Sequence, residues 1–128
     1  MKLRDDNKKT ISTHLEELLR RLPIRPGQRL IELGCGRAET TCKLAQQFPA
    51  LEIIATEVDQ VQHVKNLASD HLPNVRFQLG GAEKIELPEA SVNYVIMLKS
   101  LHHVPVPLLQ QSLREIRRVL IPGGLAYL

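Results

Sequence analysis

The chain has 128 residues, of which 43% are hydrophobic and 24% are charged, as in an ordinary globular protein with one core. No apolar run reaches 18 residues, and the first ten residues lack an apolar signal segment, which argues against a membrane span and a secretory leader. The net charge of +3 is spread along the chain and aromatic residues make up 3%, so the sequence indicates no clear nucleic-acid partner.

Cys35 and Cys42 are the only cysteines of the chain. A single pair at this spacing forms neither a disulfide framework nor a zinc site. We therefore expect reduced thiols, a cytoplasmic protein and no bound metal.

Helical and extended patterns alternate along the chain. Four segments repeat one helical face every three or four residues. The four stripes are Ile11, Leu15, Leu18, Leu19 and Leu22; Thr41, Leu44, Ala45 and Phe48; Val61, Val64, Ala68 and Leu72; and Leu109, Leu113, Ile116 and Leu120. The short apolar runs between and after the stripes predict strands at residues 29–33, 51–57, 74–79, 91–98 and 125–128. We expect the Pro-Gly-Gly run at 122–124 to form the turn before the last strand.

This alternation predicts an α/β fold with a doubly wound, mostly parallel sheet and helices on both faces. We expect residues 1–23 to form an N-terminal helix that makes a single compact unit with residues 24–128. Ligands of such sheets bind at the carboxyl ends of the strands, where the strand order switches. The first predicted strand delivers a glycine loop to that place.

The glycine loop, Gly34-Cys35-Gly36, is preceded by the acidic residue Glu32. A dinucleotide fingerprint has glycine or alanine at its sixth position, but Glu39 stands there. An acid at a helix N-terminus occupies the place of a pyrophosphate, and Glu32 adds a second repulsive charge. S-adenosylmethionine carries an ammonium and a sulfonium instead of phosphates, so the charge pattern favours this ligand over a dinucleotide.

A second acid, Glu57, ends the second predicted strand, 23 residues after Gly34. A carboxylate at this place can accept hydrogen bonds from both hydroxyl groups of an adenosine ribose. Sites for NAD also use such an acid, so Glu57 alone does not separate the two ligands.

Together these stretches resemble a class I S-adenosylmethionine-dependent methyltransferase of the small-molecule type. The resemblance covers about residues 24 to 128, and the order and spacing of its motifs are more specific than any single motif. The similar stretches are LIELGCGRAETTCKLAQQFP, IIATEVD, VRFQLGGAEKIELPEASVNYVIM, LHHV and REIRRVLIPGGLAYL. The resemblance implies the strand order 3-2-1-4-5 and S-adenosyl-L-methionine as cofactor.

The resemblance also implies roles for individual residues. The implied cofactor contacts are Glu32, Gly34, Cys35 and Gly36 at the methionine end, Glu57 at the ribose, Val58, Gly81, Ala82 and Glu83 around the adenine, and Met97 and Leu98 near the transferred methyl. His102 and His103 follow the fourth strand and are the candidate catalytic residues, as a general base or a substrate contact. The alternative for the two histidines is that one packs under the loop and the other is solvated.

Three residues depart from the family's pattern. Ala38 replaces the third loop glycine, and Asn93 replaces an aspartate at the start of the fourth strand. Gly81 stands where an acid often contacts the amino group of the adenine, so that hydrogen bond is expected to be missing.

The activity implied by these features is methyl transfer to a small-molecule acceptor. A truncated or degenerate module that binds partners without catalysis remains an alternative, and an NAD-dependent oxidoreductase is a less favoured one. The family normally continues past the fifth strand, where this chain ends, so we expect a truncated fold. We also expect the apolar strand at 125–128 to pair with a second copy, because an open strand edge invites pairing.

Overall fold

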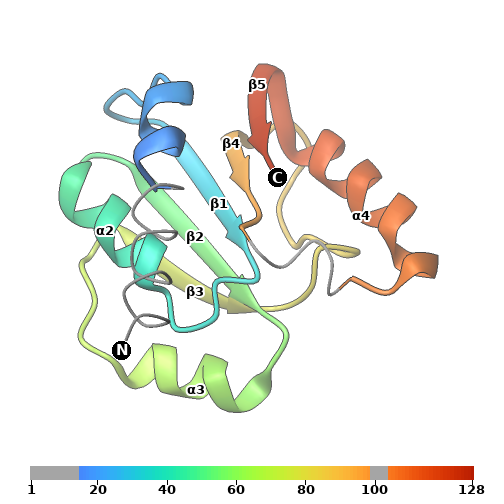
Figure 1. The fold of residues 1–128 in the computed structure, drawn as a ribbon, viewed down its shortest axis with the longest axis horizontal. Helices are drawn as coiled ribbons and strands as arrows, with labels where there is room; N and C mark the ends of the chain where they lie inside the picture. Colours follow the sequence, from blue (N-terminus) through green and yellow to red (C-terminus); the bar gives the residue numbers. More distant parts are fainter. Residues whose placement is uncertain (1–14, 99–103) are drawn as a thin grey trace, which may run out of the picture.

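The computed structural model describes residues 15–98 and 104–128. They form a five-stranded sheet with the order β3-β2-β1-β4-β5, and all four strand pairings are parallel (Figure 1). The strands are β1 (Arg29–Leu33), β2 (Glu52–Glu57), β3 (Val75–Leu79), β4 (Val92–Ile96) and β5 (Leu120–Tyr127). The helices are residues 15–21, α2 (Glu39–Gln47), α3 (Gln60–Ala68) and α4 (Val106–Val119). The predicted fold class and strand order are confirmed.

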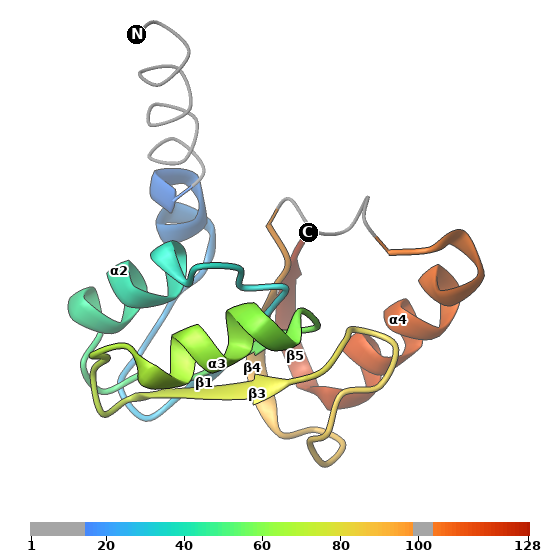
Figure 2. The ribbon, with the colours of Figure 1, turned by 90° about the horizontal axis from the view of Figure 1, so that it is seen from below.

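The central strands send alternate side chains into two separate cores, as the pleat of a strand requires. On one face, Leu30 and Ile53 pack with Leu18 of the first helix and Leu44 of α2. Figure 2 shows α2 and α3 together on one side of the sheet. The other core contains sheet residues Ile31, Ile54 and Val95 and the α4 residues Ile116 and Val119. Helices therefore cover both faces, and the sheet is buried between them.

Asn93 ties the start of β4 to the start of β1. Its Oδ1 accepts a hydrogen bond of 2.9 Å from the backbone N–H of Arg29. An amide oxygen accepts this bond as a carboxylate would, so the change from the expected aspartate leaves the strand connection in place.

The predicted turn at residues 122–124 is wrong, because these residues lie inside β5. This strand begins at Leu120, directly after α4, and its pairing with β4 shifts register between Val92 and Tyr94. Gly123 has a φ of +81°, a conformation that glycine adopts without strain and that suits such an irregularity. The Pro-Gly-Gly run therefore lies at an irregularity in the pairing of β5 with β4, where Val92 pairs with Leu120 and Tyr94 with Leu125.

The predicted apolar stripe of α3 is also wrong. Val61 and Val64 are 67% and 58% exposed, whereas Asn66 is only 4% exposed. The inner face of α3 meets polar backbone groups of the glycine loop, which an amide can satisfy and a valine cannot. On α4 the buried residues are Ser112, Ile116 and Val119. The predicted stripe is therefore correct at Ile116 and wrong at Leu113, which is exposed.

Over residues 15–98 and 104–128, no helix combines the length and the apolar character needed to cross a membrane.

Candidate active site

A cavity of about 570 Å³ lies at the carboxyl ends of the strands, next to the start of α4. Its size falls within the usual range of small-molecule sites. The lining residues are Leu33, Gly34, Glu57, Val58, Gly80, Gly81, Ala82, Glu83, Met97, Leu98, Val104, Pro105 and Leu108. Glu57 and Glu83 are the charged members of this described lining, and no basic side chain is among them. The cavity thus combines apolar walls with two acids, which suits a ligand that is neutral or cationic.

The glycine loop turns sharply at the end of β1. Gly34 and Gly36 have φ values of +68° and +55°, in the left-handed region that favours glycine. Between them, the backbone N–H of Cys35 donates a 2.8 Å hydrogen bond to the carbonyl of Thr56 on β2. The loop is therefore fixed to the neighbouring strand, with Gly34 facing the cavity.

Glu57 ends β2 and lines the cavity. Its Oε1 accepts a hydrogen bond of 2.8 Å from the N–H of Gly36, and its Oε2 accepts one of 3.0 Å from the N–H of Asp59. Each carboxylate oxygen can accept a further bond. The backbone thus orients this acid and leaves it able to receive two donors from a ligand.

Glu32 lies on β1 beneath the loop and is 3% exposed. The hydroxyl of Thr41 on α2 donates a hydrogen bond to its Oε1. Burial raises the pKa of the Glu32 carboxyl to about 7, and the Thr41 hydrogen bond opposes part of that rise. Glu32 is consequently poised to change its charge near neutral pH.

Cys35 packs against Asn66 under the same loop. The Nδ2 of Asn66 donates a 2.9 Å hydrogen bond to the carbonyl of Gly36 and lies 3.7 Å from the Cys35 sulfur. Burial, followed by the nearby Glu32 and Glu57, raises the pKa of the Cys35 thiol to about 12. A neutral, buried thiol is a packing group rather than a nucleophile. Sequence reasoning missed Asn66, because no motif marks it and the apolar residues around it suggested another inner face.

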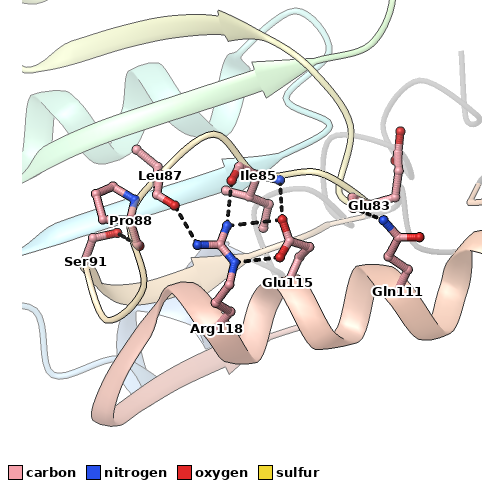
Figure 3. A network of polar contacts seen from close by, with 8 residues as sticks. All are labelled: Glu83, Ile85, Leu87, Pro88, Ser91, Gln111, Glu115 and Arg118. Atoms are coloured by element: carbon pink, nitrogen blue, oxygen red, sulfur yellow. Dashed lines mark hydrogen bonds and ion pairs between the residues drawn. The ribbon is translucent and has the colours of Figure 1, made fainter.

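The segment between β3 and β4 forms another wall of the cavity and is held by α4 (Figure 3). Arg118 donates hydrogen bonds to the carbonyls of Ile85, at 2.7 Å, and Leu87, at 2.8 Å. Glu115 accepts the N–H of Ile85 at 2.9 Å and pairs with Arg118 at 2.6 Å. The hydrogen bond from Arg118 lowers the pKa of the Glu115 carboxyl.

The three arginines of α4, Arg114, Arg117 and Arg118, differ in their surroundings. A run of arginines on a helix is usually a solvated face, and Arg114 and Arg117 are indeed exposed. Arg118 instead points at the neighbouring segment and satisfies two of its carbonyls. No local pattern predicts this difference, because the two carbonyls that Arg118 contacts are more than 30 residues away in the sequence.

The structure brings most of the predicted site residues to one cavity. The residues that line it are Gly34, Glu57, Val58, Gly81, Ala82, Glu83, Met97 and Leu98. Glu32, Cys35 and Gly36 are not part of the lining. Both candidate catalytic residues, His102 and His103, lie outside the described residues. The roles of all these residues remain predictions.

The sequence of this chain is similar to those of known methyltransferases. A family model described as a methyltransferase domain matches residues 30–124. The 27-O-demethylrifamycin SV methyltransferase of Amycolatopsis mediterranei (strain S699) is 32% identical over 130 residues, covering 94% of this chain and 46% of that protein. The trans-aconitate 2-methyltransferase of Variovorax paradoxus (strain S110) is 28% identical over 109 residues, covering 85% of this chain and 40% of that protein.

The fold is also similar to that of a methyltransferase whose structure has been solved. It is that of a methyltransferase ascribed to an antibiotic biosynthesis pathway in Anabaena variabilis ATCC 29413, with a TM-score of 0.76 and 28% identity. The match covers 89% of this chain and 43% of that chain. The present chain therefore spans less than half the length of these three relatives.

Proposed function

Because this chain belongs to the methyltransferase domain family, we propose that its cavity binds S-adenosylmethionine and that it transfers the methyl group to a small-molecule acceptor. The observation that carries the proposal is the position of Glu57, an oriented carboxylate that lines a cavity without described basic residues. Such a carboxylate can bind the two hydroxyls of a ribose.

The described residues fit this cofactor along its length. Gly34 would provide a wall without a side chain at the methionine end, and Glu57 would face the ribose. Val58 and Ala82 would supply apolar contacts for the adenine, and the buried Met97 would lie beside the sulfonium. The two acids of the lining attract the positive charges of the ligand.

S-adenosylmethionine supplies an activated methyl group, whose bond to sulfur breaks as the bond to the acceptor forms, so that S-adenosylhomocysteine is left. The protein then has to align the acceptor and exclude water, and alignment can supply most of the rate. The apolar residues Leu98, Val104 and Leu108 line the cavity and serve that exclusion.

We propose His102 or His103 as the base that takes the proton of the acceptor. The residues on either side of the segment 99–103, Leu98 and Val104, both line the cavity. Histidine is suited to the task because its usual pKa is near neutral. A variant with both histidines replaced by alanine should lose most of its methyl transfer and keep its affinity for S-adenosylhomocysteine.

A small-molecule acceptor is the proposal that the relatives favour. The names of two of them specify small organic substrates, a rifamycin derivative and trans-aconitate. We assign neither of these two substrates to this chain, because each relative is more than twice as long as the part that matches.

Calorimetric titration of the 128-residue chain with S-adenosylhomocysteine and with NAD tests the proposal. We expect S-adenosylhomocysteine to bind and NAD to bind more weakly, since two acids in the lining repel a pyrophosphate. Glu57→Ala removes two charge-assisted acceptors and should weaken binding roughly a hundredfold. Asp70→Ala, an exposed acid after α3, is the matched control and should bind normally.

Two results would overturn this reading. Tighter binding of NAD than of S-adenosylhomocysteine would favour an oxidoreductase. Binding of neither ligand would favour an interaction module without catalysis.

We also propose that two copies pair through β5. Within the described residues β5 pairs only with β4, so its other edge is open, and Leu125 and Leu128 are exposed. An open apolar edge favours addition of another strand. Light scattering should show a dimer that Leu125→Lys weakens, and a monomer at high concentration would contradict the pairing.

A further inference from the structure

We propose that the carboxylate of Glu83 accepts a hydrogen bond from the exocyclic amino group of the adenine and so selects 6-amino over 6-oxo purine nucleosides. The inference rests on the proposed function. It also revises the expectation that this hydrogen bond is missing because position 81 is a glycine.

The first observation is the space that the Glu83 carboxylate fills. A Cβ atom added to Gly81 would overlap Oε2 of Glu83 and lie 2.8 Å from its Oε1. The carboxylate therefore occupies the place where a side chain of residue 81 would begin. An acid missing at position 81 is thus replaced in space by the acid two residues later.

The second observation is that the carboxylate has no partner. Glu83 is partly buried and lines the cavity. In the part of the chain that the structure describes, its side chain takes part in no hydrogen bond or ion pair. A carboxylate can only accept hydrogen bonds, so a ligand that offers an N–H group here would satisfy it.

The third observation is that α4 fixes the backbone of Glu83. The Nε2 of Gln111 donates a 2.9 Å hydrogen bond to the carbonyl of Glu83. Figure 3 shows the Glu83 carboxylate on the opposite side from Gln111, pointing away from α4. The backbone of Ile85 is held in turn by Glu115 and Arg118. The backbone that carries the acceptor is consequently held before the ligand arrives, so only the side chain of Glu83 has to be ordered on binding.

The order of the strands in the sheet sets the orientation in which a nucleoside can bind. Glu57 ends β2, and the segment with Glu83 follows the neighbouring strand β3. A nucleoside whose ribose binds Glu57 can therefore extend its base toward Glu83. The 6-amino group of adenine can donate a hydrogen bond to the Glu83 carboxylate. The 6-oxo group of hypoxanthine and the carboxylate can both only accept, so they form no hydrogen bond with each other.

The test compares S-adenosylhomocysteine with S-inosylhomocysteine by calorimetric titration. We expect the unaltered chain to prefer the adenosyl ligand by about tenfold to hundredfold, the usual effect of one charge-assisted hydrogen bond. Glu83→Ala should weaken adenosyl binding by a similar factor and bring the ratio of the two affinities close to one. Glu86→Ala, an exposed acid on the same segment, should change neither affinity.

A rescue variant separates recognition from folding. Gly81→Asp combined with Glu83→Ala returns a carboxylate to the same space and should restore the adenosyl preference. If the unaltered chain prefers the adenosyl ligand and Glu83→Ala keeps that preference, this inference fails while the proposed function stands. If the unaltered chain binds neither ligand, the proposed function fails and this inference falls with it.

Discussion

Glu32 is a buried acid whose pKa lies near 7, well above the value of about 4.5 for a free glutamate. Between these two pKa values the folded chain binds a proton that the unfolded chain releases. Stability from this group is therefore full below pH 4.5 and is lost as the pH rises through 7. Glu32, which lies beneath the glycine loop, thus lowers the stability of the folded chain in alkaline solution.

Glu32→Gln should remove this pH dependence. The amide oxygen can still accept the hydrogen bond of Thr41, and no charge has to be buried. We expect the free energy of unfolding at pH 8 to rise by up to about 3 kcal/mol, with little change at pH 5. Urea unfolding between pH 5 and 8 measures the effect. Glu39→Gln, which replaces an exposed acid, serves as the control. If it changed the pH dependence of the free energy of unfolding as much as Glu32→Gln does, the assignment of that dependence to Glu32 would be wrong.

Asn66 shows how one side chain can position the glycine loop. Its amide donates a 2.9 Å hydrogen bond to the carbonyl of Gly36, which also accepts a longer one of 3.7 Å from the Cys35 thiol. Gln62 Nε2 donates a 2.9 Å hydrogen bond to the Oδ1 of Asn66. Asn66→Ala leaves the partly buried Gly36 carbonyl without that donor, so we expect a loss of about 1–2 kcal/mol in the free energy of unfolding. Val64→Ala on the same helix is exposed and should cost less than about 0.5 kcal/mol. A larger loss for Val64→Ala would show that the outer face of α3 is packed.

At the scale of elements, α4 acts as a support for a segment that has no regular structure. Arg118→Met keeps the length of the side chain and removes its hydrogen bonds to Ile85 and Leu87. We expect a loss of about 1–2 kcal/mol in stability, since the side chain is partly exposed. S-adenosylhomocysteine should bind about threefold to tenfold more weakly, because the wall that carries Glu83 becomes less ordered.

The neighbouring arginine provides the control for this prediction. Arg114 is exposed on the same helix, and Arg114→Met changes the charge by the same amount. It should leave both stability and binding close to those of the unaltered chain. Equal effects of the two variants would mean that net charge, rather than the contacts of Arg118, accounts for the change.

The elements themselves were largely predictable, and their orientations were not. The bounds of β1 agree with the prediction, because a short apolar run ended by glycine has few alternatives. The buried faces of α3 and α4 differ from the predicted stripes. Asn66 turns inward toward the carbonyl of Gly36, whereas the buried Ser112 donates its hydroxyl hydrogen to the carbonyl of Leu108 in its own helix. Local patterns report apolar surface, but they do not report which backbone groups a helix must satisfy.

At the scale of the whole molecule, ligand binding should be visible as added stability. A ligand that binds only the folded chain raises its free energy of unfolding by about 2.7 kcal/mol at a concentration of 100 Kd. S-adenosylhomocysteine should therefore raise the melting temperature of the unaltered chain. At the same concentration it should raise that of Glu57→Ala much less. Equal rises for the two chains would place the ligand away from Glu57.

The site was predictable from the sequence where it consists of strand ends. In a parallel sheet the carboxyl ends of the strands meet, so Gly34, Glu57 and Met97 could be brought together from their positions alone. The contributions of Asn66 and Arg118 could not, because each acts through a hydrogen bond to distant backbone.

An all-parallel sheet has a consequence for how fast the chain reaches its native state. Arg29 contacts Glu52, 23 residues away, and Asn93, 64 residues away, so strands meet only after long loops have closed. Chains with such a high contact order fold slowly, on a scale of roughly milliseconds to seconds. During that time the apolar strands stay open to other chains, and we expect the refolded yield after dilution from urea to fall as protein concentration rises.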